Sequence, residues 1–442
     1  MGNSLAQEFT LFSLLRFTLP TVCMMVLFSL YTIVDGMFVA RFVSENALAA
    51  TNIVYPIINI VLGAAIMFAT GGSAFVAKTM GEGDALLAKR RFTFIVLAAV
   101  GLGAVLALLS LVFLPRIVRL LGATDVLYAD CYAYAAILSA FAPVVILKIL
   151  FDYFLVTAGK PKWGLYSAAL GGATNIGLDY VLIVQFGMGI SGAAWATVAG
   201  YAIPCAVGLF YFARRGGTLH FVRPQVELQA IARVCGNGYS EMVTQLSMAL
   251  TTYLFNWIML RYLGESGVAA ITIVLYAEFL LTSAFLGFSS GAAPIVSYNY
   301  GSGNRTRLRR LMRHCYAAIL ASSLAIFLLA EAGAPSLVGM FANVGTEVYE
   351  ITLHGFRLFA LGFLCSGVNI FSSGMFTALS NGRVSALLSF LRNFASILLF
   401  MAILPTLLGA DGIWLVVPAA DVAALFATLY CLHSYRMLEG YI

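Results

Sequence analysis

The chain has 442 residues, of which 62% are hydrophobic and only 10% are charged, and its mean hydropathy is +0.95. A soluble protein of this length needs far more polar surface, so composition alone excludes a water-soluble enzyme or binding protein. The formal net charge of +6 does not indicate a nucleic-acid partner, because the basic residues fall in short segments between apolar stretches.

Twelve apolar stretches follow one another along the chain. A helix of about 20 apolar residues can cross a bilayer, and each stretch has roughly that length. The sequence therefore predicts an all-α polytopic membrane protein with twelve transmembrane helices. The expected spans lie near residues 12–35, 47–77, 92–114, 127–158, 163–186, 191–212, 233–260, 267–299, 314–333, 348–380, 384–408 and 412–435.

The lysines and arginines are concentrated in alternate connecting loops. The largest groups lie at residues 78–91, 214–233 and 305–313, whereas the intervening loops carry few basic side chains. By the positive-inside rule the basic loops face the cytoplasm. We therefore expect both termini to be cytoplasmic and the protein to lie in the cell inner membrane.

The second half of the sequence repeats the first at an offset of 220 residues. Arg41 aligns with Arg261 and Pro115 with Pro335, and the register holds without a gap from the first span to the last. Each half contains six spans, an even number, so both copies cross the membrane in the same order of directions. Such a parallel repeat is related by an axis along the membrane normal.

The repeat divides the chain into an N-terminal lobe at 1–212 and a C-terminal lobe at 228–442, joined by a linker at 213–227. Two lobes with a cleft between them suit an alternating-access transporter, whereas a channel needs pore-lining rings. The sequence contains no nucleotide-binding or hydrolase motif. We therefore expect a secondary transporter, neither an enzyme nor an ATP-driven pump, without a cofactor and working as a monomer.

Four polar residues of the N-terminal spans have apolar counterparts in the second repeat. Because the same helices fold with apolar residues at these positions, the fold does not require the polar set. One Asp at the bilayer centre costs about 2.5–3.5 kcal/mol on insertion scales, which favours a functional role. The pairs are Asp35 with Phe255, Asn175 with Ala395, Asp179 with Leu399, and Thr197 with Val417.

Two carboxylates, an amide and a hydroxyl offer only oxygen ligands. Asn175 and Asp179 are one helical turn apart and therefore share a helix face. Hard cations such as Na⁺ take oxygen ligands, and in a dry cavity the carboxylates of Asp35 and Asp179 can hold a proton instead. The sequence thus predicts a site for H⁺ or Na⁺ and leaves the choice between the two ions open.

Other residues in the apolar spans carry further hypotheses. Pro20 removes a hydrogen bond inside the first span and is either a hinge or a static kink. Glu241 and Glu278 can face the cleft and attract a cationic substrate, or they can bond neighbouring helices. Lys148 and Asp152, four residues apart, are expected to form a structural ion pair.

The sequence resembles the multidrug and toxic compound extrusion (MATE) family over essentially its whole length. The resemblance is carried by the first span from Pro20 to Asp35, by GKPKWGLYSAALGGATNIGLDYVLI after the fourth span, and by GISGAAWATVAG at the sixth. It implies a twelve-helix antiporter that exports amphipathic, cationic drugs or toxic compounds.

Within that family the chain is similar to the DinF-like and archaeal branch. There the N-lobe cation site uses an Asp on helix 1, an Asn and an Asp on helix 5, and a Thr on helix 6. The resemblance therefore assigns cation binding to the four polar residues, bending of helix 1 to the proline, and a place near the site to a helix-4 tyrosine. In this sequence these are Asp35, Asn175, Asp179, Thr197, Pro20 and Tyr134.

One departure and two rival functions remain. The sodium-coupled NorM-like branch also uses a Glu on helix 7 and an Asp on helix 10. Glu241 matches the first, but the tenth span, LGFLCSGVNIFSSGMF, contains no acid, which favours coupling through the N-terminal lobe. The rivals are a flippase for a lipid-linked saccharide precursor and an exporter of a specific endogenous metabolite.

Overall fold

Helices make up nearly all of the computed structural model, which describes residues 4–439. Inside a bilayer a helix satisfies its own backbone polar groups, so an apolar chain of this kind folds into helices. The first half contains a 3₁₀ turn at Ser4–Ala6 and then α1 (Leu11–Phe38), α2 (Glu45–Gly81), α3 (Ala85–Leu120), α4 (Tyr128–Ala140), α5 (Ala142–Thr157), α6 (Pro161–Asp179) and α7 (Gly189–Ala213). The second half contains α8 (Leu228–Gly301), α9 (Arg305–Gly339), α10 (Glu347–Ala360), α11 (Phe363–Ala378), α12 (Gly382–Phe390), α13 (Ser396–Leu408), α14 (Ala410–Trp414) and α15 (Val416–Glu439).

The predicted twelve spans are present. Within residues 4–439, nine helices are long and apolar enough to cross a membrane, and two bent helix pairs raise the number to eleven. The helix α8 counts once in that total, yet Gly264 breaks it with φ +65° and ψ −153°. Its first arm (residues 228–263) and second arm (residues 265–301) are separate crossings, which gives twelve.

Two of the spans are broken, which the sequence did not predict. The pair α4 and α5 bends by 54° at Phe141, and the pair α10 and α11 bends by 53°. Pro143 follows the first break closely, where a proline lacks the amide hydrogen that would continue the helix. The repeat-equivalent position of Phe141 is Leu361, which lies at the second break. The internal repeat is therefore a repeat of shape as well as of sequence.

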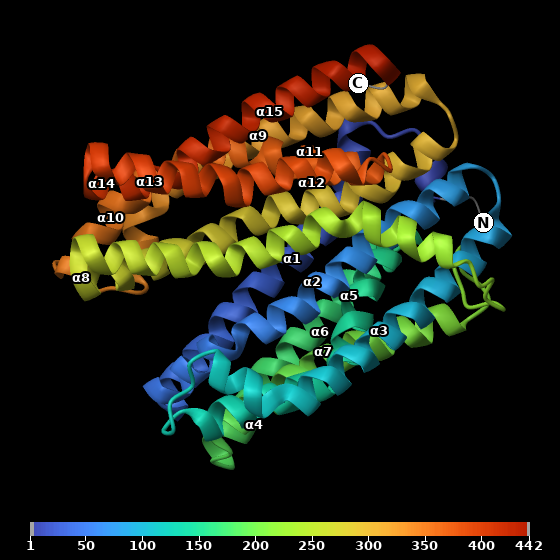
Figure 1. Cartoon of the computed structure of the whole chain (residues 1–442). Helices are drawn as coiled ribbons and strands as arrows, with labels where there is room; N and C mark the ends of the chain where they lie inside the picture. Colours follow the sequence, from blue (N-terminus) through green and yellow to red (C-terminus); the bar gives the residue numbers. More distant parts are fainter. Residues whose placement is uncertain (1–3, 440–442) are drawn as a thin grey trace.

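The helices form two groups that meet at one end of the molecule (Figure 1). Helices α1 to α7 make one group and α8 to α15 the other, and the groups lie close together at the end where both chain termini are found. They diverge toward the end that carries α4, α10 and α14. We call the first the proximal end and the second the distal end.

Backbone contacts between α2 and α8 close the proximal end. A Cβ on Gly81 would collide with the carbonyl oxygen of Tyr298, and a Cβ on Gly301 would collide with that of Lys78. Gly81 and Gly301 are repeat equivalents, as are Lys78 and Tyr298. The two lobes therefore pack symmetrically, and glycine is needed so that the backbones can approach.

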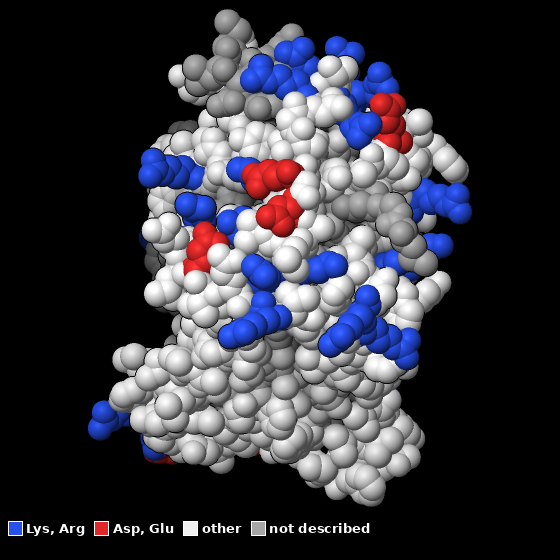
Figure 2. Space-filling view, turned by 90° about the vertical axis from the view of Figure 1, so that its right-hand side faces the viewer, with Lys and Arg blue, Asp and Glu red and all other residues white. Residues whose placement is uncertain are grey.

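Arginines and lysines outnumber aspartates and glutamates at the proximal end (Figure 2). The view onto this end shows many basic side chains and few acidic ones. The basic loops of the sequence, including Arg305–Arg313 at the start of α9, connect helices here. The structure thus brings the basic loops to one end of the bundle.

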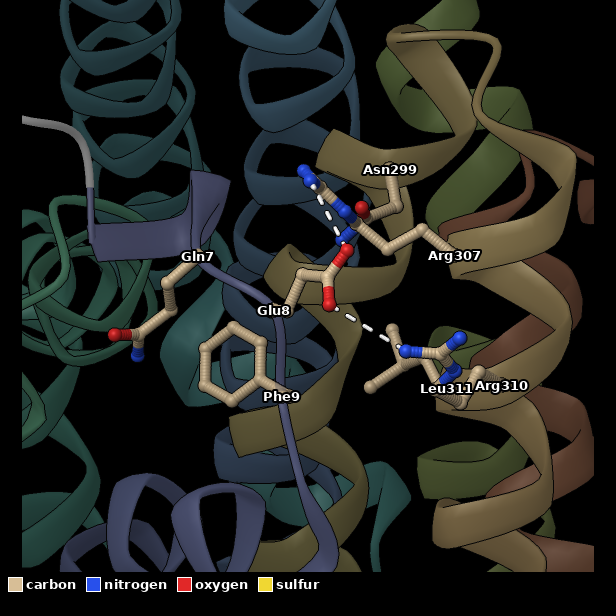
Figure 3. Close-up of a pocket in the computed structure, with 7 residues that line it drawn as sticks. All are labelled: Gln7, Glu8, Phe9, Asn299, Arg307, Arg310 and Leu311. Atoms are coloured by element: carbon tan, nitrogen blue, oxygen red, sulfur yellow. Dashed lines mark hydrogen bonds and ion pairs between the residues drawn. The ribbon is translucent and has the colours of Figure 1, made fainter.

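A short segment before α1 crosses from its own lobe to the other. Leu5 and Phe9 are buried in the core of the second group of helices, at 0% and 5% exposure. Glu8 lies 3.6 Å from an Arg307 nitrogen and 3.4 Å from an Arg310 nitrogen, as Figure 3 shows. Arg307 also donates to the Ala6 carbonyl at 2.9 Å. We call residues 4–9 the N-terminal clasp.

The segment before α8 makes the reciprocal crossing. Glu227 pairs with Arg91 of α3 at 3.3 Å, and the Phe221 ring stacks on Phe92 with the ring centroids 5.3 Å apart. Leu219 is fully buried in the core of the first group. We call residues 218–227 the linker clasp. Each half of the chain thus holds the other with the segment that precedes its first long helix.

Candidate functional site: a polar centre between two apolar cores

The first group of helices has two separate apolar cores. One contains Phe92, Phe151 and Phe212 toward the proximal end, and the other contains Val54 and Ile183 toward the distal end. Apolar side chains would be expected to join these clusters into one core. Tyr134 of the second cluster and Tyr201, which packs against the first, both interact with Asp35, so a polar centre lies where the two clusters meet.

Three of the four predicted cation ligands come together there. The side chain of Asp35 on α1 lies beside those of Asn175 and Asp179 on α6. Asn175 is 1% exposed and Asp179 is fully buried. One carboxylate oxygen of Asp35, the Asn175 amide oxygen and both Asp179 oxygens are buried without a hydrogen-bond donor. Four buried acceptors without donors are costly unless a proton or a cation satisfies them.

The backbone changes pitch beside both carboxylates. A π-helical segment at Val39–Val43 starts four residues after Asp35, and a second at Tyr180–Gln185 follows Asp179 directly. A π-helical turn leaves the regular hydrogen-bond ladder and reorients the side chains around it, and such turns are frequent at functional sites. Local geometry therefore sets both acids apart from ordinary helix interior residues.

The fourth predicted ligand, Thr197, lies on α7 and is half-buried. Its hydroxyl donates to the Ala193 carbonyl at 3.0 Å, which leaves its oxygen able to accept or to bind a cation. One turn later a Cβ on Gly200 would stand 2.9 Å from the Asn175 Cβ, so α7 packs tightly against α6 at this level. Thr197 is on the same face of α7 as Gly200.

Tyrosines surround the two carboxylates. Tyr134, which is 7% exposed, interacts electrostatically with both Asp35 and Asp179. Tyr31 and Tyr201 form a side-chain contact with each other and also interact with Asp35. Sequence reasoning missed these last two. The signal was spacing, because Tyr31 is one turn before Asp35 and Tyr201 is one turn after Thr197.

The predicted ion pair of α5 is present close by. Lys148 Nζ lies 2.8 Å from Asp152 Oδ2, and both side chains are buried. The ammonium group also lies 5.0 Å from the Phe28 ring centroid and 5.7 Å from that of Tyr201. The two charges of the pair cancel, and both residues lie on α5, so neither needs a charged partner from another helix.

A second polar centre lies in the second group of helices. Arg392 Nε is 2.6 Å from Asp421 Oδ1, while Ser366 donates to the other Asp421 oxygen. Glu241 and Glu278 both interact electrostatically with Arg392. The two glutamates singled out from the sequence therefore belong to one centre, with Arg392 and Asp421 as a cross-helix pair.

The remaining predicted residue, Pro20, is buried within α1. The helix runs from Leu11 to Phe38 without a break in its assignment. Thr21, the next residue, donates its hydroxyl hydrogen to the Thr18 carbonyl at 2.6 Å. The proline is thus accommodated in a continuous helix in this conformation.

Comparison with known proteins decides the family. The family model described as MatE matches two stretches, residues 20–181 and 242–401, which together exceed half of the chain. The chain belongs to the MatE family. The two matched stretches fall in the two groups of helices, as expected for a protein built from a repeat. Because this family consists of transporters, the MatE-family protein described here is a transporter and not an enzyme.

Relatives of this MatE-family protein include two called Multidrug export protein MepA. The protein from Staphylococcus saprophyticus subsp. saprophyticus is 23% identical over 431 residues, covering 94% of this chain and 92% of the relative. The protein from Staphylococcus aureus strain N315 is 22% identical over 430 residues, with the same coverage of both chains.

Solved structures share the fold. A MATE transporter in complex with MaL6 superimposes with a TM-score of 0.92 at 21% identity, over 97% of this chain and 96% of that one. A MOP superfamily transporter from Pyrococcus furiosus gives 0.90 at 20% identity, over 96% of both chains. A Vibrio cholerae MATE transporter, VcmN, gives 0.89 at 21% identity, over 97% of both. The MatE-family protein therefore has the twelve-helix, two-lobe fold of these transporters.

Proposed function

We propose that the protein exports amphipathic, cationic drugs or toxic compounds in exchange for an inward-moving cation. Membership of the MatE family supports the transport function, and relatives called multidrug export proteins support the substrate class. In alternating access the two lobes would move relative to each other, so that the cleft between them opens to one side of the membrane at a time.

The proposed coupling site is the centre formed by Asp35, Asn175 and Asp179, with Thr197 beside it. The observation that carries this proposal is the group of four buried oxygens without donors. Protonation of the carboxyl groups would supply donors among them, and Na⁺ would coordinate them directly. A proton bridges two carboxylates, whereas Na⁺ takes carboxylate, amide and hydroxyl oxygens together.

Cation and substrate would alternate. With a cation bound, the charges of the two acids are neutralised, and α1 and α6, which carry them, can approach each other. Without a bound cation, repulsion between the Asp35 and Asp179 carboxylates disfavours the conformation in which the two helices are close. A cation entering from the distal side would thus favour release of the drug there, and its departure to the cytoplasm would reset the transporter.

We propose the following placement in the cell. The two lobes are residues 1–212 and 228–442, and residues 213–227 are the linker. The protein lies in the cell inner membrane, with the basic proximal end on the cytoplasmic side. Both termini are then cytoplasmic, and the protein acts as a monomer in the bilayer. A cysteine-labelling assay on intact cells tests this orientation, because a cysteine introduced at residues 302–304, between α8 and α9, should react only after the membrane is permeabilised.

A dedicated exporter is the second candidate. A flippase for a lipid-linked saccharide or an exporter of one endogenous metabolite would share this fold, since fold alone does not fix the substrate. A pyrophosphate substrate would call for several unpaired cations in the cleft. The buried cations Lys148 and Arg392 are each paired with an aspartate, which favours the cationic substrate.

The test is ethidium efflux from cells that lack their own pumps. Asp35→Asn and Asp179→Asn should each reduce efflux at least tenfold at matched expression, because an amide cannot exchange the coupling proton or balance a cation. Ethidium transport measured in everted vesicles, with pH and sodium concentration varied separately, identifies the coupling ion. Efflux that persists in the Asp35→Asn, Asp179→Asn double variant would refute coupling at this site.

A further inference from the structure

The ion pair of Lys148 and Asp152 interrupts the apolar layer between the coupling site and the proximal end. The two residues are 6% and 4% exposed. Phe151, which lies between them on α5, belongs to the proximal apolar core of the first group of helices. Asp152 is five residues before Thr157, the last residue of α5, and so lies about 8 Å along the helix from its end. A coupling cation that goes to the cytoplasm has to cross this layer.

The second repeat indicates that the fold does not require this pair. The aligned positions on α11 hold Val368 and Ser372, and α11 forms the corresponding helix with no charged residue in it. A buried ion pair adds little net stability, because the loss of hydration of both charges offsets their attraction. A pair that neither forms the helix nor stabilises it much indicates a role in transport.

Two tyrosines connect the pair with the coupling site. The Lys148 ammonium lies 5.7 Å from the centroid of the Tyr201 ring. Tyr201 is in side-chain contact with Tyr31, and both tyrosines interact electrostatically with Asp35 on one side and with Asp152 on the other. A phenol hydroxyl both donates and accepts hydrogen bonds. The tyrosines therefore provide a polar connection from the coupling acids to the pair on α5.

Hydroxyl groups continue this polar connection on the proximal side of the pair. Thr157 donates to the Ser73 hydroxyl oxygen of α2 at 3.1 Å, and both residues are buried. The carbonyl of the next residue, Ala158, accepts a hydrogen bond of 2.9 Å from Thr218 of the linker clasp. Polar groups thus follow α5 from the level of the coupling site to the proximal end.

Lys148 has a second favourable contact that does not depend on Asp152. Its ammonium lies 5.0 Å from the centroid of the Phe28 ring, in addition to its contact with Tyr201. Because ring faces attract cations, the ammonium can release the Asp152 carboxylate and remain stabilised. A lone carboxylate in this layer would hold a passing cation tightly, whereas competition from Lys148 makes that binding weak enough for the cation to leave.

We propose that the coupling cation leaves for the cytoplasm by way of Asp152 and that Lys148 then displaces it. A proton would pass from a protonated carboxyl group of the coupling site to the Asp152 carboxylate, and the first group would be left ionised. A sodium ion would instead be coordinated by the Asp152 carboxylate while Lys148 rests against the rings. When Lys148 pairs with Asp152 again, the cation moves on past Thr157. This inference rests on the proposed cation-coupled export and adds the residues of the exit route.

The experiment compares two modes of transport by the purified full-length protein in proteoliposomes. Net ethidium efflux, driven by imposed pH and sodium gradients, requires the coupling cation to leave. Exchange of labelled for unlabelled ethidium at equal concentrations does not, because the dye moves in both directions without the cation. Lys148→Val combined with Asp152→Ser installs the residues of the second repeat. This double variant should slow net efflux about tenfold and keep exchange within about twofold of the wild type.

Two further variants separate the exit route from folding. Tyr201→Phe keeps the ring beside Lys148 and removes only the hydroxyl, so it should slow net efflux severalfold and leave exchange unchanged. Leu155→Met is the matched control, because Leu155 is buried on α5 and its repeat equivalent is Met375. Both modes should then proceed as in the wild type. The thermal unfolding midpoint of each variant is measured first.

The outcomes distinguish this inference from the proposed function. Wild-type net efflux in both the Lys148→Val, Asp152→Ser variant and Tyr201→Phe would show that the pair is structural, and the exit route would be wrong. Equal loss of exchange and of net efflux in these variants would also refute it, because the defect would then lie outside cation exit. Net efflux that persists in the Asp35→Asn, Asp179→Asn double variant would instead refute the coupling site itself.

Discussion

Arg392 and Asp421 show how a buried ion pair contributes to stability. The pair is 2.6 Å apart, and the Asp421 side chain is 1% exposed. Removing two charges from water costs about as much as their attraction returns, so such a pair adds little net stability. Removing only one partner is different, because the other charge is then buried without compensation.

We predict that Arg392→Ala destabilises the protein by about 3–5 kcal/mol. The midpoint of thermal unfolding of the purified protein should fall by several degrees. Arg119→Ala is the matched control, since Arg119 and Asp125 are also 2.6 Å apart but 55% and 89% exposed. An exposed pair contributes about 0–1 kcal/mol, so an equal loss in both variants would contradict the argument.

At the residue scale the sequence predicted the acids better than their neighbours. The comparison of the two repeats singled out Asp35 and Asp179. In each case one repeat has an acid within a membrane helix and the other has an apolar residue at the aligned position, and acids are rare within membrane helices. It could not isolate Tyr31 or Tyr201. Tyrosine is common in this chain and is tolerated both in cores and at membrane surfaces, so its presence carries little information without coordinates. The role of the acids as coupling residues stays a prediction.

At the element scale, the contact between α2 and α8 depends on two glycines. We predict that Gly81→Ala and Gly301→Ala each force the proximal ends apart, because the new methyl group would meet a backbone carbonyl that cannot turn away. Ethidium efflux should fall at least severalfold. Ser302→Cys should become more reactive toward a water-soluble maleimide that reaches the proximal end.

Gly101→Ala on α3 is the control for this pair, since nothing lies within 4 Å of a Cβ there. Alanine at an unobstructed helical position usually stabilises a helix slightly. Wild-type efflux in Gly101→Ala together with wild-type efflux in Gly81→Ala would show that the close approach is dispensable.

The spans themselves were predictable, whereas their breaks were not. Hydropathy marks where a helix can cross a bilayer, and the expected stretches at 233–260 and 267–299 match the two arms of α8. The breaks at Phe141 and Leu361 arise from local backbone geometry within apolar runs. Hydropathy does not report that geometry, since both sides of each break are equally apolar.

At the scale of the whole molecule, the N-terminal clasp connects the two lobes. Its ion pairs at Glu8 are partly exposed and contribute about 0.2–1 kcal/mol each, whereas burial of Phe9 is worth about 3–5 kcal/mol by comparison with other Phe→Ala changes. We therefore predict that Phe9→Ala loosens the proximal end far more than Glu8→Ala. Hydrogen exchange in Arg305–Leu311 of α9 measures the effect.

The linker clasp supplies the comparison for that experiment. Glu227→Ala removes the pair with Arg91, whose side chains are less exposed at 26% and 14%, and should leave hydrogen exchange in α9 unchanged. If Glu8→Ala and Phe9→Ala raise hydrogen exchange in α9 equally, the ion pairs of Glu8 stabilise the N-terminal clasp as much as burial of Phe9 does. That result would contradict the prediction.

The two clasps also bear on how this protein arose. Each half of the chain lays its leading segment on the opposite half, the first through Glu8 and the second through Glu227. A single six-helix unit, before duplication and fusion, would in this arrangement form a twofold dimer whose subunits exchange arms. Fusion would then have kept both exchanged arms and made their pairing independent of concentration. The present polypeptide is, in these terms, a domain-swapped homodimer on one chain.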